Sequence, residues 1–213
     1  MGANSRAIGL MGGTFNPIHY GHLVAAETAR DAFALDRVIF VPAGQPPHKS
    51  RTVAAAEHRY LMTFLATASN RRFDTSRVEI ERPGPSYTSD TLAHFHASDP
   101  DARWYFITGA DAVMEIAGWH AAEDIFRYAE VIAASRPGYA LRLQELEPAL
   151  GEKLCKVHHL EVPALAISSS DIRARVMQGL SIRYLVPEAV ENYIRKCGLY
   201  QSQREAWHPE PGA

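Results

Sequence analysis

Two histidines, His19 and His22, flank Gly21 at a spacing that could bind phosphate. They follow an apolar run and a pair of glycines, and helical spacing of apolar residues begins at Leu23, so His22 falls near the first turn of an expected helix. The N-terminus of a helix presents unpaired N–H groups and partial positive charge, and glycines let an anion approach the backbone closely. The fragment predicts either a phosphate site or two turn histidines bonded to nearby backbone.

A second cluster, near the carboxyl end of the chain, places three hydroxyls before a helix. Ser168, Ser169 and Ser170 precede helical spacing, and Arg173 lies early in that helix. An arginine in this position works against the helix dipole unless an anion balances it. Ser168 with Asp171 three residues later also approximates a capping box. The cluster therefore predicts either a polyphosphate site or a simple helix cap.

Strand-to-helix turns must position both clusters. Residues 8–11 fit a strand, 23–35 a helix and 37–42 a second strand, which together predict a parallel, right-handed βαβ unit. Further strands are expected at residues 78–81, 103–108, 130–135, 157–162 and 164–167. Further helices are expected at residues 57–69, from 87 onward, within 141–154 and at 187–197. We expect an α/β fold, Rossmann-like and doubly wound, with a mainly parallel sheet and helices on both faces.

Length and composition limit the class of protein. The 213 residues suit one domain, expected at 1–200, followed by a mobile polar tail at 201–213. A net charge of -2 gives no overall basic field for nucleic acid. The two cysteines form no C-x-x-C pair, and no apolar run approaches about 18 residues. We expect a reduced, cytoplasmic, soluble protein that binds neither nucleic acid nor membrane.

Two cations follow strands and would reach the same edge of the sheet. Lys49 lies in a proline-containing loop after the strand at 37–42, and Arg136 follows the strand at 130–135. In open α/β sheets, loops beyond the carboxyl ends of the strands line the ligand crevice. For Lys49, a solvated position on a surface loop fits the same fragment.

Other residues at helix starts could bind a nucleotide or serve the fold alone. Thr88 and Ser89 open a helix, where hydroxyls act as N-caps or grip an anion. Asp111 follows a strand that ends at Gly109, so its carboxylate could cap the next helix, the commoner use, or accept two ribose hydroxyls. Trp119, flanked by small residues, could lie in the core or stack on a flat heterocycle.

His19-x-Gly21-His22 resembles the H-x-G-H signature of the nucleotidyltransferase superfamily. The preceding Gly-Gly-Thr-Phe-Asn-Pro run is similar to that of bacterial nicotinate-nucleotide adenylyltransferases. The cluster that begins at Ile167 resembles the superfamily's I-S-S-x-x-I-R signature, and the segments around Lys49 and Tyr87 are also similar to the same family. The resemblance extends from about residue 8 to residue 200.

The resemblance implies a reaction in which ATP and nicotinate mononucleotide give deamido-NAD and pyrophosphate. The attacking phosphate monoester has a second pKa of about 6 and is mostly ionised at neutral pH, so no general base is required. Mg²⁺ would bridge ATP phosphate oxygens mainly through water, and we expect no dedicated metal ligand from the protein. Self-association into a homo-oligomer is left open.

The resemblance also implies site residues. The catalytic group would comprise His19, His22, Lys49 and Arg173. The ATP site would comprise Gly12, Gly13, Thr14, Phe15, His22, Gly109, Asp111, Ile167, Ser168, Ser169 and Arg173. The pyridine nucleotide site would comprise Tyr87, Thr88, Trp119, His120 and Arg136.

Within these groups, each residue would contact a different part of the substrates. His22 would contact the α-phosphate, with His19 beside it as a second donor and turn organiser. Asp111 would hold the adenosine ribose, Thr88 the nicotinate carboxylate and Trp119 the pyridine ring. The remaining phosphate ligands would be Ser168, Ser169 and Arg173 on the β- and γ-phosphates, Lys49 on the triphosphate, and Arg136 on a substrate phosphate.

Four other interpretations stay open. A nicotinamide-preferring enzyme would be hard to distinguish. Phosphopantetheine adenylyltransferases usually carry threonine in place of the first histidine and are shorter, so His19 and Trp119 argue against them. A zinc hydrolase using His19 and His22 would need further ligands, and this spacing without a downstream carboxylate or cysteine set is weak for zinc. A non-catalytic nucleotide sensor would leave the combination of His22, Ser168 and Arg173 unexplained.

Overall fold

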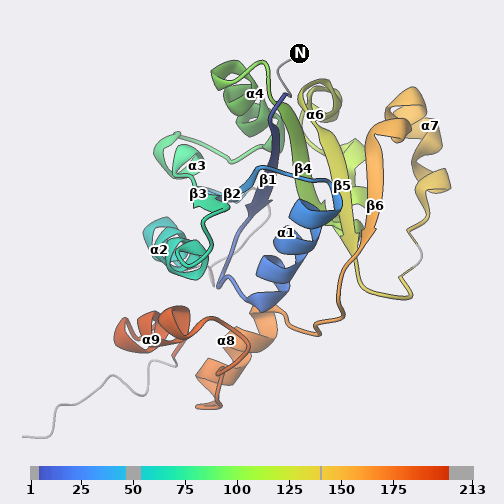
Figure 1. Cartoon of the computed structure of the whole chain (residues 1–213). Helices are drawn as coiled ribbons and strands as arrows, with labels where there is room; N and C mark the ends of the chain where they lie inside the picture. The colour runs from blue at the N-terminus through green and yellow to red at the C-terminus, as the bar shows by residue number, and fades with distance from the viewer. Residues whose placement is uncertain (1–4, 47–53, 140, 202–213) are drawn as a thin grey trace, which may run out of the picture.

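The computed structural model describes residues 5–46, 54–139 and 141–201. Within these residues, six parallel strands form one sheet in the order β3-β2-β1-β4-β5-β6 (Figure 1). The chain builds outward from β1 on one side and then returns to place β4, β5 and β6 on the other. This order confirms the expected α/β, Rossmann-like, doubly wound fold.

Strands and helices alternate along most of the chain. The strands are β1 (Ala7–Gly13), β2 (Arg37–Pro42), β3 (Phe73–Thr75), β4 (Arg103–Gly109), β5 (Glu130–Ser135) and β6 (Val157–Glu161). The α-helices are α1 (Tyr20–Ala32), α2 (Ala56–Thr67), α3 (Val78–Glu81), α4 (Thr88–Ser98), α5 (Ala110–Met114), α6 (Ala122–Tyr128), α7 (Glu147–Leu150), α8 (Ser169–Met177) and α9 (Glu188–Lys196). Short 3₁₀ helices are η1 (Ile116–Gly118), η2 (Leu143–Leu146) and η3 (Gly151–Lys156).

Helices cover both faces of the sheet, and alternate residues of each strand enter one of two cores. On one face, Ile8 and Leu10 of β1 pack in the core that includes residues of α4, α5 and α6. On the other face, Met11 packs in the core that includes residues of α1, α2, α8 and α9. Strands buried on both faces read as continuous apolar runs, which is why the central strands were recognisable from the sequence.

The strand expected at residues 78–81 is wrong, because this segment forms the single helical turn α3. The amides of Ile80 and Glu81 donate to the carbonyl oxygen of Arg77 at 2.8 and 3.0 Å, so local hydrogen bonds close the turn. Four alternating residues are too few to distinguish a strand from one turn of helix. The edge strand is β3, which precedes this segment and pairs with β2.

The strand expected at residues 164–167 is also wrong. Pairing with β5 ends at Glu161, and the chain then leaves the sheet without regular structure until α8. Ala164 and Ala166 are exposed, so this apolar run is not a core strand. The run instead brings the chain back to the start of α1, below the carboxyl ends of the strands in Figure 1.

The remaining expected helices are present with adjusted ends. The segment at 141–154 contains consecutive short turns, η2, α7 and η3, with a break at Gly151, whose φ is +52°. Pro187 occupies the N-cap of α9 instead of its first helical position. Of the expected mobile tail at 201–213, all but Gln201 lies outside the described residues.

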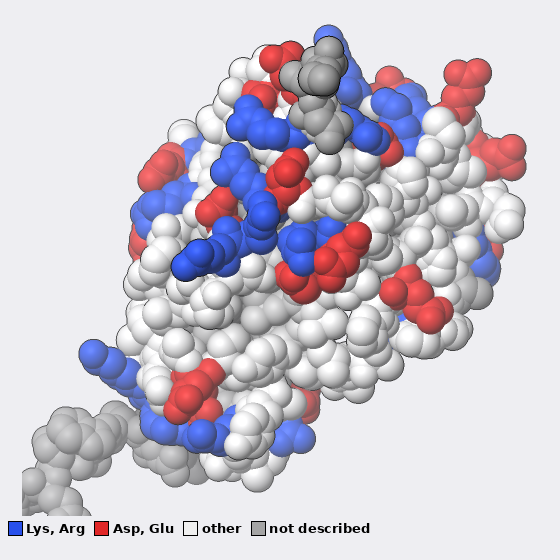
Figure 2. Space-filling view, in the orientation of Figure 1, with Lys and Arg blue, Asp and Glu red and all other residues white. Residues whose placement is uncertain are grey.

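Charged side chains are mixed on the molecular surface. On the face in Figure 2, Lys and Arg lie among Asp and Glu, and a largely uncharged band separates the upper and lower groups. Within the described part of the chain, no helix is both long and apolar enough to cross a membrane. The positive charge that a phosphate ligand needs must therefore come from a few local groups.

Candidate active site

The carboxyl ends of β1 and β4 form the point where the strand order reverses. β1 ends at Gly13 and β4 at Gly109, and the two strands pair along most of their length. In doubly wound folds this switch point opens a crevice that binds ligands. The topology thus brings two of the expected ATP-site segments to one location.

The turn after β1 adopts a backbone that few side chains tolerate. Phe15 has a φ of +47° and is buried. A Cβ on Gly13 would lie 2.9 Å from the Phe15 ring, so glycine is needed for that ring to fold back. Left-handed backbone in a bulky residue is strained and clusters at functional sites. The strained turn lies where the phosphate site is expected.

His19 and His22 begin α1 and contact each other. The backbone amide of His19 donates to Nδ1 of His22 at 3.2 Å, and the two rings stack with centroids 3.8 Å apart. A Cβ on Gly21 would lie 3.0 Å from the His19 ring, which explains the small residue between them. Because Nδ1 of His22 accepts a hydrogen bond, the ring proton of neutral His22 lies on Nε2. His22 therefore accepts a hydrogen bond from the backbone of the turn through Nδ1 and also carries an N–H donor, Nε2, at the start of α1.

His19 is buried, with 6% of its surface exposed, and Nδ1 has no hydrogen-bond partner among the described residues. Burial lowers the pKa of His19 to about 4. The ring is therefore neutral at pH 7 and lies at the N-cap of α1, while its expected role as an organiser of the turn stays a prediction. Its expected second role, donation to phosphate, stays a prediction.

The burial of His19 predicts a loss of stability in acid. Its folded pKa lies below the unfolded value of 6.5, so the unfolded state binds more protons and stability falls as pH drops from 6.5 toward 4. The contribution lost is about 3 kcal/mol. Urea unfolding at about pH 7 and about pH 4.5 measures this change. His19→Asn keeps a capping residue and should be less sensitive to acid, and an equal acid response in both proteins would contradict a neutral buried ring.

The second cluster lies directly against the turn after β1. Ser169 Oγ donates to the carbonyl oxygen of Pro17 at 2.8 Å, and an Arg173 guanidinium nitrogen donates to the carbonyl oxygen of Asn16 at 2.8 Å. These partners are 152 and 157 residues apart in sequence. Ser168 also caps α8, since its Oγ accepts from the amide of Asp171 at 3.0 Å. The interpretation of Ser168 as a helix cap is thus correct. In addition, Ser169 and Arg173 join this second motif to the turn that contains the first motif.

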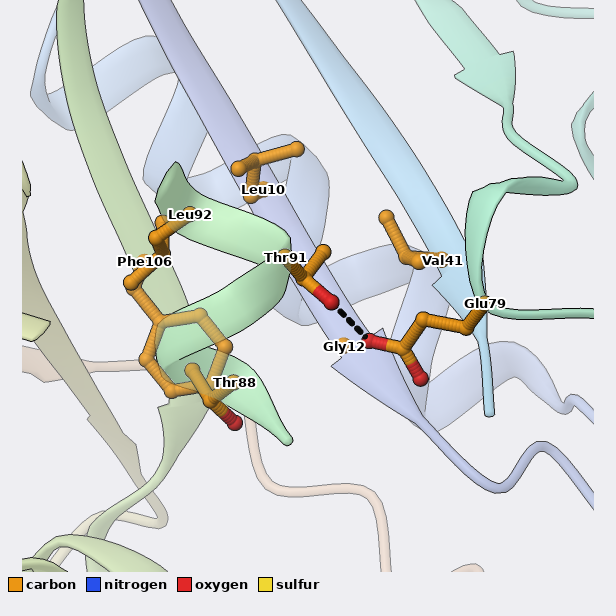
Figure 3. Close-up of a pocket in the computed structure, with 8 residues that line it drawn as sticks. All are labelled: Leu10, Gly12, Val41, Glu79, Thr88, Thr91, Leu92 and Phe106. Atoms are coloured by element: carbon orange, nitrogen blue, oxygen red, sulfur yellow. Dashed lines mark hydrogen bonds between the residues drawn. The ribbon is translucent and has the colours of Figure 1, made fainter. Parts of the chain in front are cut away.

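The segments expected to hold the pyridine nucleotide also meet. Tyr87 stacks on His120 with ring centroids 4.1 Å apart, and half-buried Trp119 packs edge-on against Phe106 at 6.1 Å. Thr88 lines a small cavity with Gly12 of β1 and Phe106 of β4 (Figure 3). The N-terminus of α4 therefore lies beside the end of β1.

The N-cap expected from Thr88 or Ser89 is wrong. Tyr87 occupies the cap position of α4 without a side-chain cap bond, and the buried Ser89 hydroxyl makes no hydrogen bond within the described structure. Within this helix, Leu92 packs in the core with Leu10 of β1 and Phe106 of β4, so α4 is held by tertiary contacts. A tertiary contact of this kind has no local sequence signal.

Asp111 does not cap α5, contrary to the commoner use expected for it. Gly109 is the N-cap residue without a side-chain bond, and Asp111 lies exposed in the first turn. A hydrogen bond with the Asp111 carboxylate is the main factor that raises the pKa of Tyr139. Tyr139 belongs to the same loop as exposed Arg136, so α5 and this loop meet beyond β4 and β5.

Lys49 lies outside the described residues.

Comparisons with known proteins decide the family. A cytidylyltransferase-like family profile matches residues 10–175. A Mycobacterium tuberculosis protein is 55% identical over 195 residues and a Moorella thermoacetica protein 57% over 198, each covering 91% of both chains, and both are named "probable nicotinate-nucleotide adenylyltransferase". The chain belongs to the nicotinate-nucleotide adenylyltransferase family. The resemblance found in the motifs is confirmed.

Solved structures agree on the fold of this adenylyltransferase family member. A Plasmodium falciparum nicotinic acid mononucleotide adenylyltransferase complexed with NaAD matches with a TM-score of 0.75 and 22% identity, covering 92% of this chain and 97% of that one. A Vibrio parahaemolyticus structure described as a nicotinate-nucleotide adenylyltransferase matches with a TM-score of 0.66 and 18% identity, over 92% and 96% of the two chains. At these identities the likeness shows the fold alone.

Two buried charges near the site of this family member were missed from the sequence. Arg59 of α2 is 1% exposed and donates to three backbone carbonyl oxygens. Glu79 of α3 is 7% exposed, and burial raises its pKa despite a 2.6 Å hydrogen bond from Thr91. The sequence did contain one signal for Arg59. It lies on the apolar face of the helix expected at 57–69, at a position where a core residue would be expected.

Proposed function

We propose that the protein transfers AMP from MgATP to nicotinate mononucleotide, giving deamido-NAD and pyrophosphate. A phosphate oxygen of nicotinate mononucleotide attacks the α-phosphorus, and the bond from that phosphorus to the bridging oxygen of the β-phosphate breaks. The attacking phosphate is mostly ionised at neutral pH, so the protein need not remove a proton. Catalysis then depends on positioning and on neutralising charge.

One observation carries this proposal, namely the junction of the two phosphate motifs. Ser169 and Arg173 of α8 bond to the turn that precedes α1, so both helix starts lie at one place. Two helix N-termini and a guanidinium supply the donors that a triphosphate requires. Arg173 donates to the carbonyl oxygen of Asn16 at 2.8 Å and to Ser170 Oγ at 3.2 Å. Its guanidinium has five N–H groups in all. It can therefore hold the loop and still bind phosphate.

His22 is assigned to the α-phosphate. Its proton on Nε2 is a donor at the first turn of α1, where the helix dipole also favours negative charge. As charge shifts toward the pyrophosphate leaving group, such a donor stabilises the transition state more than the ground state. Ser168 and Ser169, with Arg173, are assigned to the β- and γ-phosphates.

The pyridine nucleotide is assigned to the surface between α4 and η1. Trp119 would stack on the ring and Thr88 would bind the carboxylate at the helix start, with Tyr87 and His120 as the adjoining stacked pair. Asp111 would accept the adenosine ribose hydroxyls, and Arg136 would bind a substrate phosphate. Lys49 is retained as a ligand of the triphosphate on the basis of the motif alone.

Mg²⁺ enters this proposal with ATP as part of the substrate. Within the described residues, His, Cys, Asp and Glu side chains form no cluster of three that could hold a metal ion. The donor set around the turn consists of N–H, hydroxyl and guanidinium groups, which bind phosphate oxygens rather than a cation. We further propose a cytoplasmic enzyme whose partners are its two small-molecule substrates.

A comparison of acceptors tests the proposed function. The protein is incubated with MgATP and, separately, with nicotinate mononucleotide, nicotinamide mononucleotide or phosphopantetheine, and pyrophosphate release is measured. The fastest release is expected with nicotinate mononucleotide. Faster release with either other acceptor would reassign the substrate, and no release with any acceptor would favour a nucleotide sensor.

Trp119→Ala is expected to raise KM for nicotinate mononucleotide by about tenfold or more, with a much smaller change in KM for MgATP. The loss of one aromatic stacking partner costs about 0.5–1.5 kcal/mol beyond the lost buried area. Steady-state kinetics with each substrate varied in turn measures the two constants. Phe64→Ala, which removes an exposed aromatic from α2, is the control. Equal weakening of both substrates would remove Trp119 from the ring site.

A further inference from the structure

Arg59 is a fully buried cation whose hydrogen bonds all go to backbone carbonyl groups at the edge of the candidate site. Its Nε donates to Ala54 at 2.9 Å, and its two terminal nitrogens donate to Thr14 at 2.9 Å and Gly44 at 3.0 Å. These three carbonyls belong to the turn after β1, the segment after β2 and the segment before α2. One side chain therefore ties the turn after β1 to both ends of the connection between β2 and α2.

Burying the charged side chain of Arg59 lowers the stability of the fold, so stability does not explain why an arginine occupies this position. Within the described part of the chain, no ion pair joins Arg59 to a carboxylate. Burial lowers the pKa of Arg59, although electrostatic interactions with Tyr200 and Glu79 oppose that shift. An apolar residue at this core-facing position of α2 would avoid the desolvation of a cation. A planar guanidinium can, however, donate to several acceptors held in fixed directions, which no apolar residue can do.

The bond to Thr14 fixes the orientation of the next peptide group. In a trans peptide the carbonyl oxygen and the following N–H point in opposite directions. With the Thr14 carbonyl directed at Arg59, the N–H of Phe15 is directed away from α2. The Phe15 ring in turn packs edge-on against His22, with centroids 5.1 Å apart. A chain of contacts thus connects Arg59 to His22 through Thr14 and Phe15.

The bond to Gly44 extends the same connection toward α4. Ser86 Oγ accepts from the amides of Gly44 and Gln45 at 2.9 and 3.2 Å, and Ser86 also hydrogen bonds to Glu79. Glu79 accepts from Thr91 of α4, which Figure 3 shows beside Gly12 of β1. The buried side chains of Arg59 and Glu79 are therefore connected through Gly44 and Ser86.

We propose that Arg59 is a positioning residue that holds the turn after β1 in the conformation that binds and activates MgATP. The inference rests on the proposed function. Arg59 does not contact the substrates, and it acts by keeping the Thr14 carbonyl, the strained Phe15 backbone and the His22 ring in register. No role of this kind follows from the H-x-G-H or I-S-S-x-x-I-R motifs.

Kinetics of Arg59→Lys and Arg59→Met test the proposal, with Arg77→Met as the control. Lysine keeps the charge but lacks the planar fork, so it cannot reach all three carbonyls in the same directions. We expect Arg59→Lys to lower kcat by about tenfold and to raise KM for MgATP more than KM for nicotinate mononucleotide, with larger effects in Arg59→Met. Arg77 pairs with Glu57 and Glu81 at the surface and does not touch the turn, so its variant should match the wild type.

Thermal unfolding of each variant separates positioning from simple stabilisation. A residue that only stabilises the fold would lower the melting temperature but leave kcat and both KM values unchanged where the protein is folded. Unchanged kcat and KM values in a folded Arg59→Lys variant would overturn the proposal. If Arg59→Met does not fold, the kinetics of Arg59→Lys alone test the proposal.

Calorimetric binding of MgATP distinguishes failure of this inference from failure of the proposed function. Binding requires no acceptor and no turnover. A wild type that binds MgATP several-fold more tightly than Arg59→Lys but releases no pyrophosphate would refute the proposed function and support the positioning role. Equal affinity for MgATP together with unchanged kinetics would refute the role of Arg59.

Discussion

His22→Ala is expected to lower kcat by about 10²-fold or more, because removing one preorganised transition-state donor typically has an effect of this size. The KM for nicotinate mononucleotide should change little, since His22 is assigned to the α-phosphate of ATP and not to that substrate. His22 also accepts the amide of His19 at 3.2 Å, so the free energy of unfolding should fall by about 1 kcal/mol. Pyrophosphate release at saturating substrates measures the effect.

A matched control for this prediction is His94→Ala. His94 is exposed on α4, away from the turn after β1, so its removal should leave kcat unchanged. Circular dichroism and thermal unfolding would establish that both variants are folded. If folded His22→Ala turned over at the wild-type rate, His22 would have no role in stabilising the transition state.

Gly44→Ala is expected to reduce the free energy of unfolding by about 3 kcal/mol. A Cβ at this position would overlap the carbonyl oxygen of Glu79 and lie 2.8 Å from its carbonyl carbon. Both atoms belong to the backbone of α3, so the methyl group could be accommodated only by separating two chain segments. For a domain of this size, the melting temperature should fall by roughly 6–12 °C.

Gly118→Ala is the comparison for this effect. A Cβ on Gly118 meets no atom within 4 Å, and the residue does not adopt a left-handed backbone. The substitution should therefore be neutral, or stabilising by about 0.5 kcal/mol through the unfolded state. Equal melting temperatures for the two variants would mean that the segments at Gly44 and Glu79 are not packed as tightly as their backbone distances indicate.

Periodicity identified most helices and strands because each pattern reports burial directly. β1, β2, β4 and β5 are buried on both faces and appear in the sequence as apolar runs. The pattern failed where it was short, at residues 78–81, and where an apolar run was exposed, at 164–167. In the first case local hydrogen bonds formed a helical turn, and in the second the chain had left the sheet.

For the candidate site, the sequence supplied the groups but not their partners. The motifs around His22 and Arg173 suggested phosphate chemistry because of their residue types at helix starts. The sequence could not show that Ser169 and Arg173 bond to the turn before α1, since that contact joins residues more than 150 positions apart. Nor could it show that the Asp111 carboxylate hydrogen bonds to Tyr139 of a distant loop instead of capping α5.

The sequence by itself determined the fold class, the family and the chemical groups available for phosphate transfer, because these follow from local periodicity and short motifs. The tertiary structure alone decided that His19 is buried and neutral and that Arg59 and Glu79 lie inside the protein. Burial and hydrogen bonding across distant segments set the protonation and orientation of a side chain. Neither property is encoded in the spacing of neighbouring residues.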